Sequence, residues 1–194
     1  MSVLLGLTGS IATGKTITAR IFAEEGISVW DADEAVHRLY ANGGNAVVPI
    51  SEAFPDAIKD GSVDRQVLKT ELEKDPSAFD RLNSIVHPLV RDDREAFIKN
   101  HDEPILLFDI PLLFETGAEA WLHKTILTTI DIDEQRRRVA ARRTMTETQL
   151  ELILSRQMPD REKRKKADYV IETWSKVHVR RRVKDILKEI STDA

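Results

Sequence analysis

Short apolar runs alternate with longer charged segments along the chain. The runs are rich in leucine and β-branched residues, and their lengths are typical of strands buried on both faces of a sheet. The five runs are Val3–Leu7, Ile27–Trp30, Pro104–Asp109, Lys124–Asp131 and Asp168–Glu172. The segments between them have the helical period, so the pattern predicts a three-layer α/β fold in which helices flank a five-stranded parallel sheet.

The segment between the second and third runs, residues 31–103, is too long for one crossover helix. Helical periodicity, interrupted by "NGGN", "DGSVD" and "HP", divides it into several short helices. These are Asp33–Ala41, Ala46–Phe54, Asp64–Glu73, Ala78–Val86 and Leu89–Asn100. We therefore expect residues 34–100 to form an inserted, mostly helical subdomain.

Two further helices are predicted between the fourth and fifth runs, by "DEQRRRVAARR" and "TETQLELILSRQM", with a break near Thr144. Thr146 and Gln149 have the spacing of a capping box for the second helix, and Pro159 ends it. We expect residues 133–165 to form a helical lid, and the core to combine residues 1–33, 101–132 and 166–194.

Composition narrows the class of protein. A chain of 194 residues suits one compact unit with insertions. Its 33 acidic and 29 basic residues give a net charge of −4, which argues against a general nucleic-acid binder. There are no cysteines, which excludes disulfides and thiolate metal sites. Without a charged leader or an apolar run of about 18 residues, we expect a cytoplasmic protein without a membrane anchor.

The stretch after the first run carries the strongest chemical signal. Gly9, Gly14, Lys15 and Thr16 match the phosphate-loop pattern G-x-x-x-x-G-K-[ST]. In such a loop the backbone N–H groups point at phosphate oxygens, the lysine reaches the β and γ phosphates, and the threonine hydroxyl binds Mg²⁺. The alternative is a chance match in an ordinary strand–helix turn. A buried strand before the pattern and an apolar helical stripe after it favour a nucleotide-phosphate site.

Two aspartates follow other predicted strands. Asp33 lies just after the second strand, where a carboxylate can accept a proton from an attacking hydroxyl; alternatively, it only caps the next helix. Asp109 ends the third strand, where an acidic group commonly orders Mg²⁺ through water in P-loop enzymes. An ionised aspartate at the end of a buried strand also needs a partner.

The arginine-rich helix has one distinctive stripe. Gln135, Arg138 and Arg142 share a helix face, whereas Arg136, Arg137 and Arg143 point elsewhere. A guanidinium from such a stripe can offset charge on a transferring phosphoryl group. The alternative is a solvated helix face, which is also what we expect of "DREKRKK", Asp160–Lys166.

An ordered series of short segments resembles the dephospho-coenzyme A kinase family, which has a P-loop kinase fold. The series is "GLTGSIATGKT", "DADEAVH", "VHPLV", "DIPLLFE", "DEQRRRVAARR", "RQM" and "ADYVI", from Leu5 to about Ile171. The resemblance implies transfer of the γ-phosphate of ATP to the ribose 3′-hydroxyl of dephospho-coenzyme A, the last step of coenzyme A synthesis. It also implies Mg²⁺ as cofactor. We expect a monomer or a weak homo-oligomer.

The resemblance also assigns candidate roles to individual residues. Those of the ATP loop are Ala12, Thr13, Gly14, Lys15, Thr16 and Ile17. Asp33 becomes the general base and possible cap, and Arg142, with Arg138 second, the lid arginine. The candidate acceptor site consists of His87 beside Pro88, an apolar wall of Leu112, Leu113 and Phe114, and Glu115 at its mouth. Without the resemblance, the leucines would be ordinary core residues. Arg156 and Gln157 match the family's "RQ", and their direct involvement stays open.

Several positions depart from the family pattern. Ser10 and Ala12 replace glycines, and a Cβ at position 12 hinders positive φ. Thr173 and Trp174 replace asparagine and glycine in a loop that borders the adenine in such folds. Trp174 is therefore either a stacking partner of the base or a surface or packing aromatic.

Two other functions compete with this hypothesis. One is a small-molecule kinase for a nucleotide or a sugar acid, against which the acceptor-side segments argue. The other is a GTP-dependent switch or nucleotide-binding regulator. The chain has no Asn-Lys-x-Asp tetrapeptide, which makes guanine selectivity a poor expectation.

Overall fold

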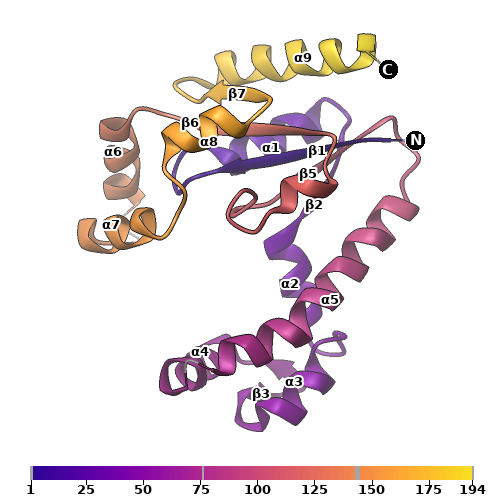
Figure 1. Ribbon diagram of the computed structural model, residues 1–194, viewed down its shortest axis with the longest axis vertical. Helices are drawn as coiled ribbons and strands as arrows, with labels where there is room; N and C mark the ends of the chain where they lie inside the picture. Colours follow the sequence, from indigo (N-terminus) through magenta and orange to yellow (C-terminus); the bar gives the residue numbers. More distant parts are fainter. Residues whose placement is uncertain (1, 76, 143–144, 194) are drawn as a thin grey trace. The chain divides into compact units, whose positions relative to one another are not determined.

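The computed structural model describes residues 2–75, 77–142 and 145–193 (Figure 1). The predicted break near Thr144 and the predicted orientation of Arg143 lie outside these residues. The chain divides into two compact units, one formed by residues 1–30 and 102–194 and the other by residues 31–101. We describe each unit by itself.

The first unit is built on a five-stranded sheet. Its strands are β1 (Val3–Gly9), β2 (Ser28–Asp31), β5 (Ile105–Asp109), β6 (Lys124–Thr129) and β7 (Tyr169–Glu172), in the order β2-β5-β1-β6-β7. β1 runs parallel to both β5 and β6, and β6 runs parallel to β7. All five predicted strands are confirmed. Where a strand end differs from the prediction, it shifts by one or two residues. β1 is central, so the loop that follows it lies where ligands bind in open parallel sheets.

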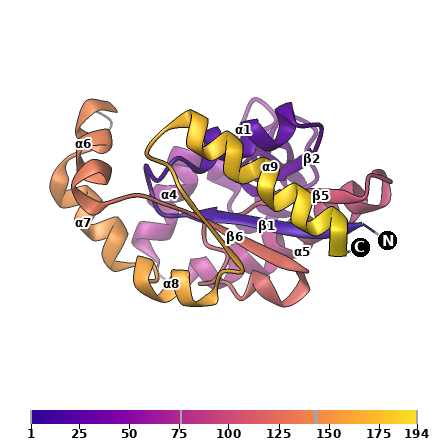
Figure 2. The ribbon, with the colours of Figure 1, turned by 90° about the horizontal axis from the view of Figure 1, so that it is seen from above.

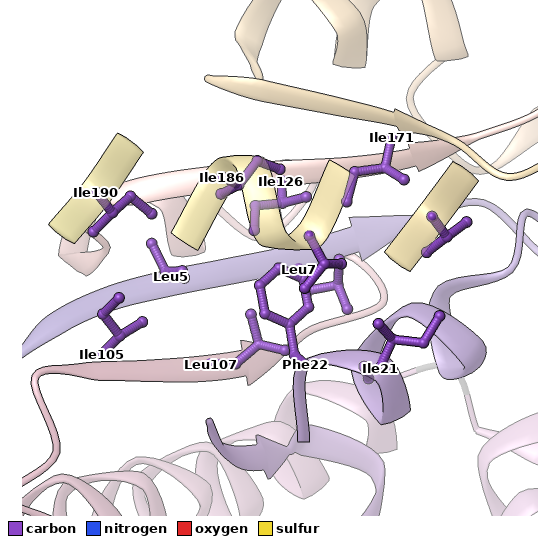
Figure 3. Packing of buried hydrophobic residues seen from close by; sticks show 13 residues of the cluster. Leu5, Leu7, Ile21, Phe22, Ile105, Leu107, Ile126, Ile171, Ile186 and Ile190 are labelled. Carbon is purple, nitrogen blue, oxygen red and sulfur yellow. The ribbon is translucent and has the colours of Figure 1, made fainter. Parts of the chain in front are cut away.

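Two helices cover one face of this sheet. α1 (Lys15–Glu24) and α9 (Lys176–Asp193) contact each other, and Figure 2 shows α9 running across the strands beside α1. Figure 3 shows how apolar side chains of both helices meet those of the strands; Leu5, Leu7, Phe22, Ile126 and Ile186 have at most a trace of exposed surface. Because alternate strand residues face this layer, the core fixes the register of β1 and hence the start of the following loop.

The remaining helices of the first unit come from the predicted lid region. α6 (Ile132–Arg142) packs on α7 (Glu147–Ser155), and α8 (Asp160–Lys166) lies along β6. A 3₁₀ turn, η2 (Ala118–Trp121), precedes β6. The capping box is confirmed, since Thr146 accepts from the Gln149 backbone while the Gln149 side chain accepts from Thr146 N–H.

The second unit is mostly helical, around its own apolar core. It contains α2 (Ala32–Tyr40), α3 (Val47–Ala53), the 3₁₀ turn η1 (Pro55–Ala57), α4 (Arg65–Lys74) and α5 (Ala78–Lys99). The prediction of two helices separated at Pro88 is wrong, because α5 is continuous. Pro88 lies on the exposed face, so the carbonyl that it leaves without a helical hydrogen bond can reach water. The buried stripe of Ala78, Leu82 and Val86 continues into half-buried Leu89 and Val90, which keeps the helix intact.

A small hairpin in the second unit was not predicted. β3 (Ile58–Lys59) and β4 (Ser62–Val63) pair antiparallel across Asp60 and Gly61, whose φ angles are 50° and 75°. Two left-handed residues define the tight turn that joins such strands, and Asp-Gly is a favoured sequence for it. No helix among the described residues combines the length and apolarity that a membrane crossing requires.

Candidate active site

The glycine-rich loop connects β1 to α1 in the first unit. Gly9 leaves no room for a side chain, because a Cβ there would lie 2.1 Å from the Thr128 hydroxyl. Gly14 has a φ of 92°, and a Cβ there would come within 3.0 Å of Thr173. The two glycines of the motif are thus required by close packing and by a left-handed backbone, respectively.

Ala12 adopts the conformation that its Cβ was expected to hinder. Its φ is 60°, which costs an alanine about 1–2 kcal/mol relative to the right-handed regions. The residue is 7% exposed and belongs to a small apolar cluster with Val139 of α6 and Leu150 of α7. Alanine in place of glycine therefore costs backbone strain at this position, but its methyl group packs against the arginine-rich helix α6 and against α7.

Lys15 and Asp109 form an ion pair at the carboxyl end of the sheet. Lys15 Nζ lies 2.5 Å from Asp109 Oδ1, and the carboxylate side chain is 3% exposed. The pairing register places Asp109 beside Leu7 of β1, two residues before the loop begins at Gly9. The partner that a buried aspartate needs is therefore the lysine of the phosphate loop.

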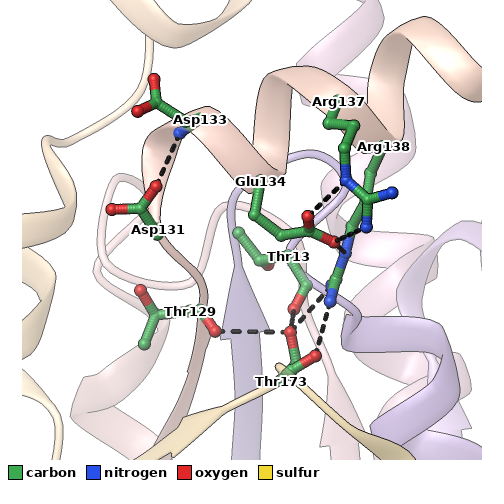
Figure 4. Close-up of polar contacts among 8 residues, drawn as sticks. All are labelled: Thr13, Thr129, Asp131, Asp133, Glu134, Arg137, Arg138 and Thr173. Atoms are coloured by element: carbon green, nitrogen blue, oxygen red, sulfur yellow. Dashed lines mark hydrogen bonds and ion pairs between the residues drawn. The ribbon is translucent and has the colours of Figure 1, made fainter.

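Two carbonyl groups of the loop accept hydrogen bonds from side chains outside it, and Figure 4 shows the one between Thr173 and Thr13. The buried Gln135 side chain donates Nε2–H to the Ile11 carbonyl at 2.6 Å. The Thr173 hydroxyl donates to the Thr13 carbonyl, also at 2.6 Å, and Thr173 N–H donates to the Thr129 carbonyl. The loop is thereby joined to α6 and to the segment after β7.

Arg138 is held by several groups at once. Its Nη1 and Nη2 donate to the hydroxyl and carbonyl oxygens of Thr173 at 3.0 and 2.6 Å, and its Nε donates to Glu134 at 2.8 Å (Figure 4). Hydrogen bonds from Arg137 and then Arg138 lower the pKa of Glu134 to about 2. Two members of the predicted stripe, Gln135 and Arg138, therefore face the loop region, and the guanidinium of Arg138 is anchored.

Arg142 is the exposed member of the stripe. It lines a cleft of about 430 Å³ together with Gly14, Ile17, Thr173 and Trp174. Trp174 is 60% exposed, and its ring stacks on His178 with centroids 4.4 Å apart. The cleft thus begins at the phosphate loop and has an aromatic and a guanidinium group in its lining.

Asp33 is not the cap of its helix. Asp31 is the N-cap of α2, and its carboxylate accepts from Asp33 N–H and Glu34 N–H at 2.8 and 3.0 Å. The alternative in which Asp33 caps this helix is therefore wrong, because the cap lies two residues earlier, at Asp31. Asp33 lies in the first turn of α2 with its side chain exposed.

The "DIPLLFE" residues lie in two different environments. Leu113 is fully buried beside Gly6, which corresponds to the ordinary core alternative for the leucines, and Phe114 is 5% exposed. Leu112 is 41% exposed. In the second unit, His87 is exposed on α5 next to Pro88.

Glu115 forms a buried ion pair. Its Oε1 lies 2.8 Å from Nζ of Lys163, whose side chain is completely buried, and also accepts from Met158 N–H. Burial raises the pKa of Glu115, but the hydrogen bonds from Lys163 and Met158 outweigh it and leave the pKa below its ordinary value. The expectation that "DREKRKK" is wholly solvated is wrong for Lys163, because this carboxylate draws its ammonium group inward.

The residues present suit a Mg²⁺ ion that arrives with a nucleotide. Thr16 is exposed at the start of α1, and Asp109 ends β5. Within residues 2–75, 77–142 and 145–193, no three acidic or histidine side chains gather closely enough to cage a metal. Mg²⁺ commonly takes one or two protein oxygens and completes its shell with phosphates and water, which these two residues fit.

Sequence reasoning missed the contribution of Thr128. Its hydroxyl contacts that of Thr13 at 3.1 Å and donates to the Thr8 carbonyl, beside Gly9. The available signal was a pair of threonines at the carboxyl end of an otherwise apolar strand. Lys163 left no comparable signal, because its neighbours in the charge run look the same in sequence.

A central strand that leads through this glycine-rich loop into a helix, with a paired lysine and strand-end aspartate, is the arrangement of P-loop nucleotide-binding proteins, and the fold within that class is the P-loop kinase fold. The fold aligns with shikimate kinase from Acinetobacter baumannii at a TM-score of 0.55 and 16% identity, covering 100% of this chain and 95% of that one. This likeness concerns the fold alone, and it confirms the predicted fold class.

The chain belongs to the dephospho-coenzyme A kinase family. The family model described as dephospho-CoA kinase matches residues 3–178. A protein named dephospho-CoA kinase from Ruegeria pomeroyi is 51% identical over 190 residues, covering 98% of this chain and 96% of the relative. A crystal structure of TT1252 from Thermus thermophilus aligns with a TM-score of 0.86 and 32% identity over 97% of both chains. The resemblance in the sequence is thereby confirmed.

Proposed function

We propose that the protein transfers the γ-phosphate of ATP to the ribose 3′-hydroxyl of dephospho-coenzyme A and so completes coenzyme A. The observation that carries the proposal is the family match, which extends over residues 3–178 and so includes all of the second unit and most of the first. The first unit supplies a phosphate loop with a paired lysine. The second, with His87 on α5, is our candidate for holding the acceptor.

Three side chains have direct roles in this proposal. Lys15, which pairs with Asp109, shares its ammonium group between this carboxylate and the β and γ phosphates of ATP, whose charge it offsets. Asp33 accepts the proton of the attacking 3′-hydroxyl; the helix-capping duty falls on Asp31, so the Asp33 carboxylate is available. Arg142 offsets the charge that spreads over the oxygens of the transferring group. Arg138, anchored on Thr173, is the second candidate for that duty.

The nucleotide base has a candidate location. The cleft lined by Gly14, Ile17, Arg142 and Trp174 adjoins the loop, so a base attached to loop-bound phosphates can enter it. Trp174 offers an exposed ring for stacking there. Of the two alternatives for Trp174, we favour base contact.

Mg²⁺ is the proposed cofactor, with ATP as co-substrate. Thr16 and Asp109 are the side chains that would hold it. Bound there, the ion would offset negative charge on the phosphates of ATP.

We further propose that residues 133–165 act as a lid over the loop. The contacts of Gln135, Arg138 and Ala12 join this region to the loop in the described structure. Closing over both substrates would exclude water and prevent wasteful hydrolysis of ATP. We place the reaction in the cytoplasm, without nucleic acid or membrane, in a monomer or weak homo-oligomer.

The proposed substrate is tested by a coupled assay of ADP formation. Dephospho-coenzyme A, nucleoside monophosphates and shikimate are offered in turn with ATP and with GTP. We expect turnover with dephospho-coenzyme A and ATP. Turnover of another acceptor with dephospho-coenzyme A inert, or a strong preference for GTP, would refute the proposal.

A further inference from the structure

Two side chains outside the phosphate loop hold two of its peptide groups. Gln135 of α6 donates to the Ile11 carbonyl, and Thr173, just after β7, donates to the Thr13 carbonyl, each at 2.6 Å. Both donors are buried, with 5% and 7% of their surface exposed, so water offers little competition for these carbonyls.

The geometry of the peptide bond extends these contacts to the N–H groups. In a planar trans peptide the carbonyl of one residue and the N–H of the next point in opposite directions. The described residues have no cis peptide bonds. A carbonyl held toward Gln135 therefore turns Ala12 N–H away from it, and a carbonyl held toward Thr173 turns Gly14 N–H away likewise.

We propose that Gln135 and Thr173 are positioning residues that orient the Ala12 and Gly14 N–H groups toward the phosphates of a bound nucleotide. An anion site of this kind is formed by main-chain N–H groups that point to one side of the loop. Thr13 N–H, which lies between Ala12 and Gly14, donates to the Ser10 carbonyl instead. Ala12 and Gly14 both have left-handed φ angles, 60° and 92°, which such a site uses. Were either peptide to turn over, its carbonyl oxygen would face the phosphates and repel them.

Arg138 completes the arrangement at Thr173. A hydroxyl has one proton, and Thr173 gives it to the Thr13 carbonyl while accepting from Arg138 Nη1 at 3.0 Å. A charged donor on the hydroxyl oxygen strengthens the bond that the hydroxyl donates. The role of Arg138 in this account is to polarise Thr173 and fix its rotamer, and Thr173 in turn fixes the peptide.

The inference rests on the proposed function only in requiring that the loop binds a nucleotide. Binding of ADP and of adenosine is measured separately, because adenosine carries no phosphate. For Thr173→Val, which keeps the shape but removes the hydroxyl, we expect ADP affinity to fall about tenfold and adenosine affinity to fall by clearly less, although Thr173 also lines the cleft proposed for the base. Gln135→Met should behave in the same way, and Thr173→Ser should restore ADP affinity.

A matched control separates this effect from a general loss of packing. Thr125 is also a buried threonine, and it lies at the amino end of β6, away from the loop. Its hydroxyl donates to Asp168. Thr125→Val should leave both affinities unchanged. The inference is overturned if ADP affinity is unchanged in Thr173→Val and Gln135→Met. It is also overturned if Thr173→Ser loses as much ADP affinity as Thr173→Val. An equal loss for ADP and adenosine also overturns it. Absence of dephospho-coenzyme A turnover would instead refute the proposed function and leave this binding test decisive.

Discussion

Nζ of Lys15 lies 2.5 Å from Oδ1 of Asp109, so the lysine of the phosphate loop is bound to the carboxylate that ends the neighbouring strand. The lysine side chain is 17% exposed, and this pairing places its ammonium group at the carboxyl end of β5. The same carboxylate would help to hold Mg²⁺ in our proposal. The pair thus places the positive charge of Lys15 and the negative charge of Asp109 side by side at the proposed phosphate site.

Replacing the lysine tests the phosphate site directly. Lys15→Ala should lower kcat/KM for ATP by at least about 100-fold, because a charge-assisted contact to the β and γ phosphates is lost. Titration calorimetry with ADP should show weakened binding as well. Retained catalysis would contradict the phosphate-loop account.

Asp33 is expected to act in the chemical step. Asp33→Asn should lower kcat by at least about 100-fold and leave ATP binding nearly intact, because a general base acts in the transition state. Its thermal stability should match the wild type. By contrast, Asp31→Ala removes the cap of α2 and should reduce the free energy of unfolding by about 1 kcal/mol. Near wild-type turnover of Asp33→Asn would exclude it as the base.

Arg142 should contribute to rate without contributing to stability. The side chain is exposed, so Arg142→Ala should leave the melting temperature unchanged and lower kcat about 10³-fold. Arg136 is a matched control on the same helix, where it forms long ion pairs with Glu147 and Glu151, at 3.6 and 3.9 Å. Steady-state kinetics of both variants decides the point. Equal, small effects would place Arg142 on a merely solvated helix face.

The buried pair of Lys163 and Glu115 predicts an unusual response to pH. The pKa of Glu115 is lowered in the folded protein, so its contribution to stability is present above its ordinary pKa and is lost as the pH falls below it. Lys163→Met leaves a buried carboxylate without its cation, which should cost about 3–5 kcal/mol at pH 7. Burial then raises the pKa of Glu115, so part of this loss should be recovered on acidification to about pH 5.

Urea denaturation between pH 4 and 8 measures this effect. Lys165→Met is the control, since Lys165 lies on the same helix with its side chain 59% exposed and pairs with Glu162 at the surface. It should change the free energy of unfolding by less than about 1 kcal/mol at every pH. A Lys163→Met protein that is no less stable than this control would contradict the assignment.

Ala12 should tolerate glycine but not valine. Ala12→Gly relieves left-handed strain of about 1–2 kcal/mol but gives up a buried methyl group and adds freedom to the unfolded chain, so the net change should stay within about 1 kcal/mol. A β-branched residue at a φ of 60° is a severe outlier, and Ala12→Val should lose more than about 2 kcal/mol. Chemical denaturation compares the two. Equal stability of Ala12→Val and the wild type would contradict the strained conformation.

The sequence could predict the strands and the phosphate loop because each is a local pattern. An apolar run gives a buried strand whichever residues pair with it, and Gly9, Gly14 and Lys15 stand at set spacings. The prediction of a helix break at Pro88 is wrong because packing of the flanking apolar stripe outweighs the loss of one hydrogen bond. The hairpin at Asp60–Gly61 carried a recognised turn signal, which the short, weakly apolar flanks obscured.

The contacts of the site could not be read from spacing. Thr173 meets Thr13 across 160 positions, and Lys163 differs from its charged neighbours only in what lies opposite it. Both depend on long-range packing, whereas the stripe of Gln135 and Arg138 follows from helix geometry alone. The departures at Ala12 and Thr173 proved to be where the loop is strained and where it is held.

The most direct test of the central claim is identification of the product. The protein is incubated with ATP, Mg²⁺ and dephospho-coenzyme A, and the product is examined by mass spectrometry and by phosphorus NMR. The account predicts the gain of one phosphate, located on the ribose 3′ oxygen, with one ADP formed for each coenzyme A. Hydrolysis of ATP with dephospho-coenzyme A unchanged, or a phosphate at another position, would contradict it.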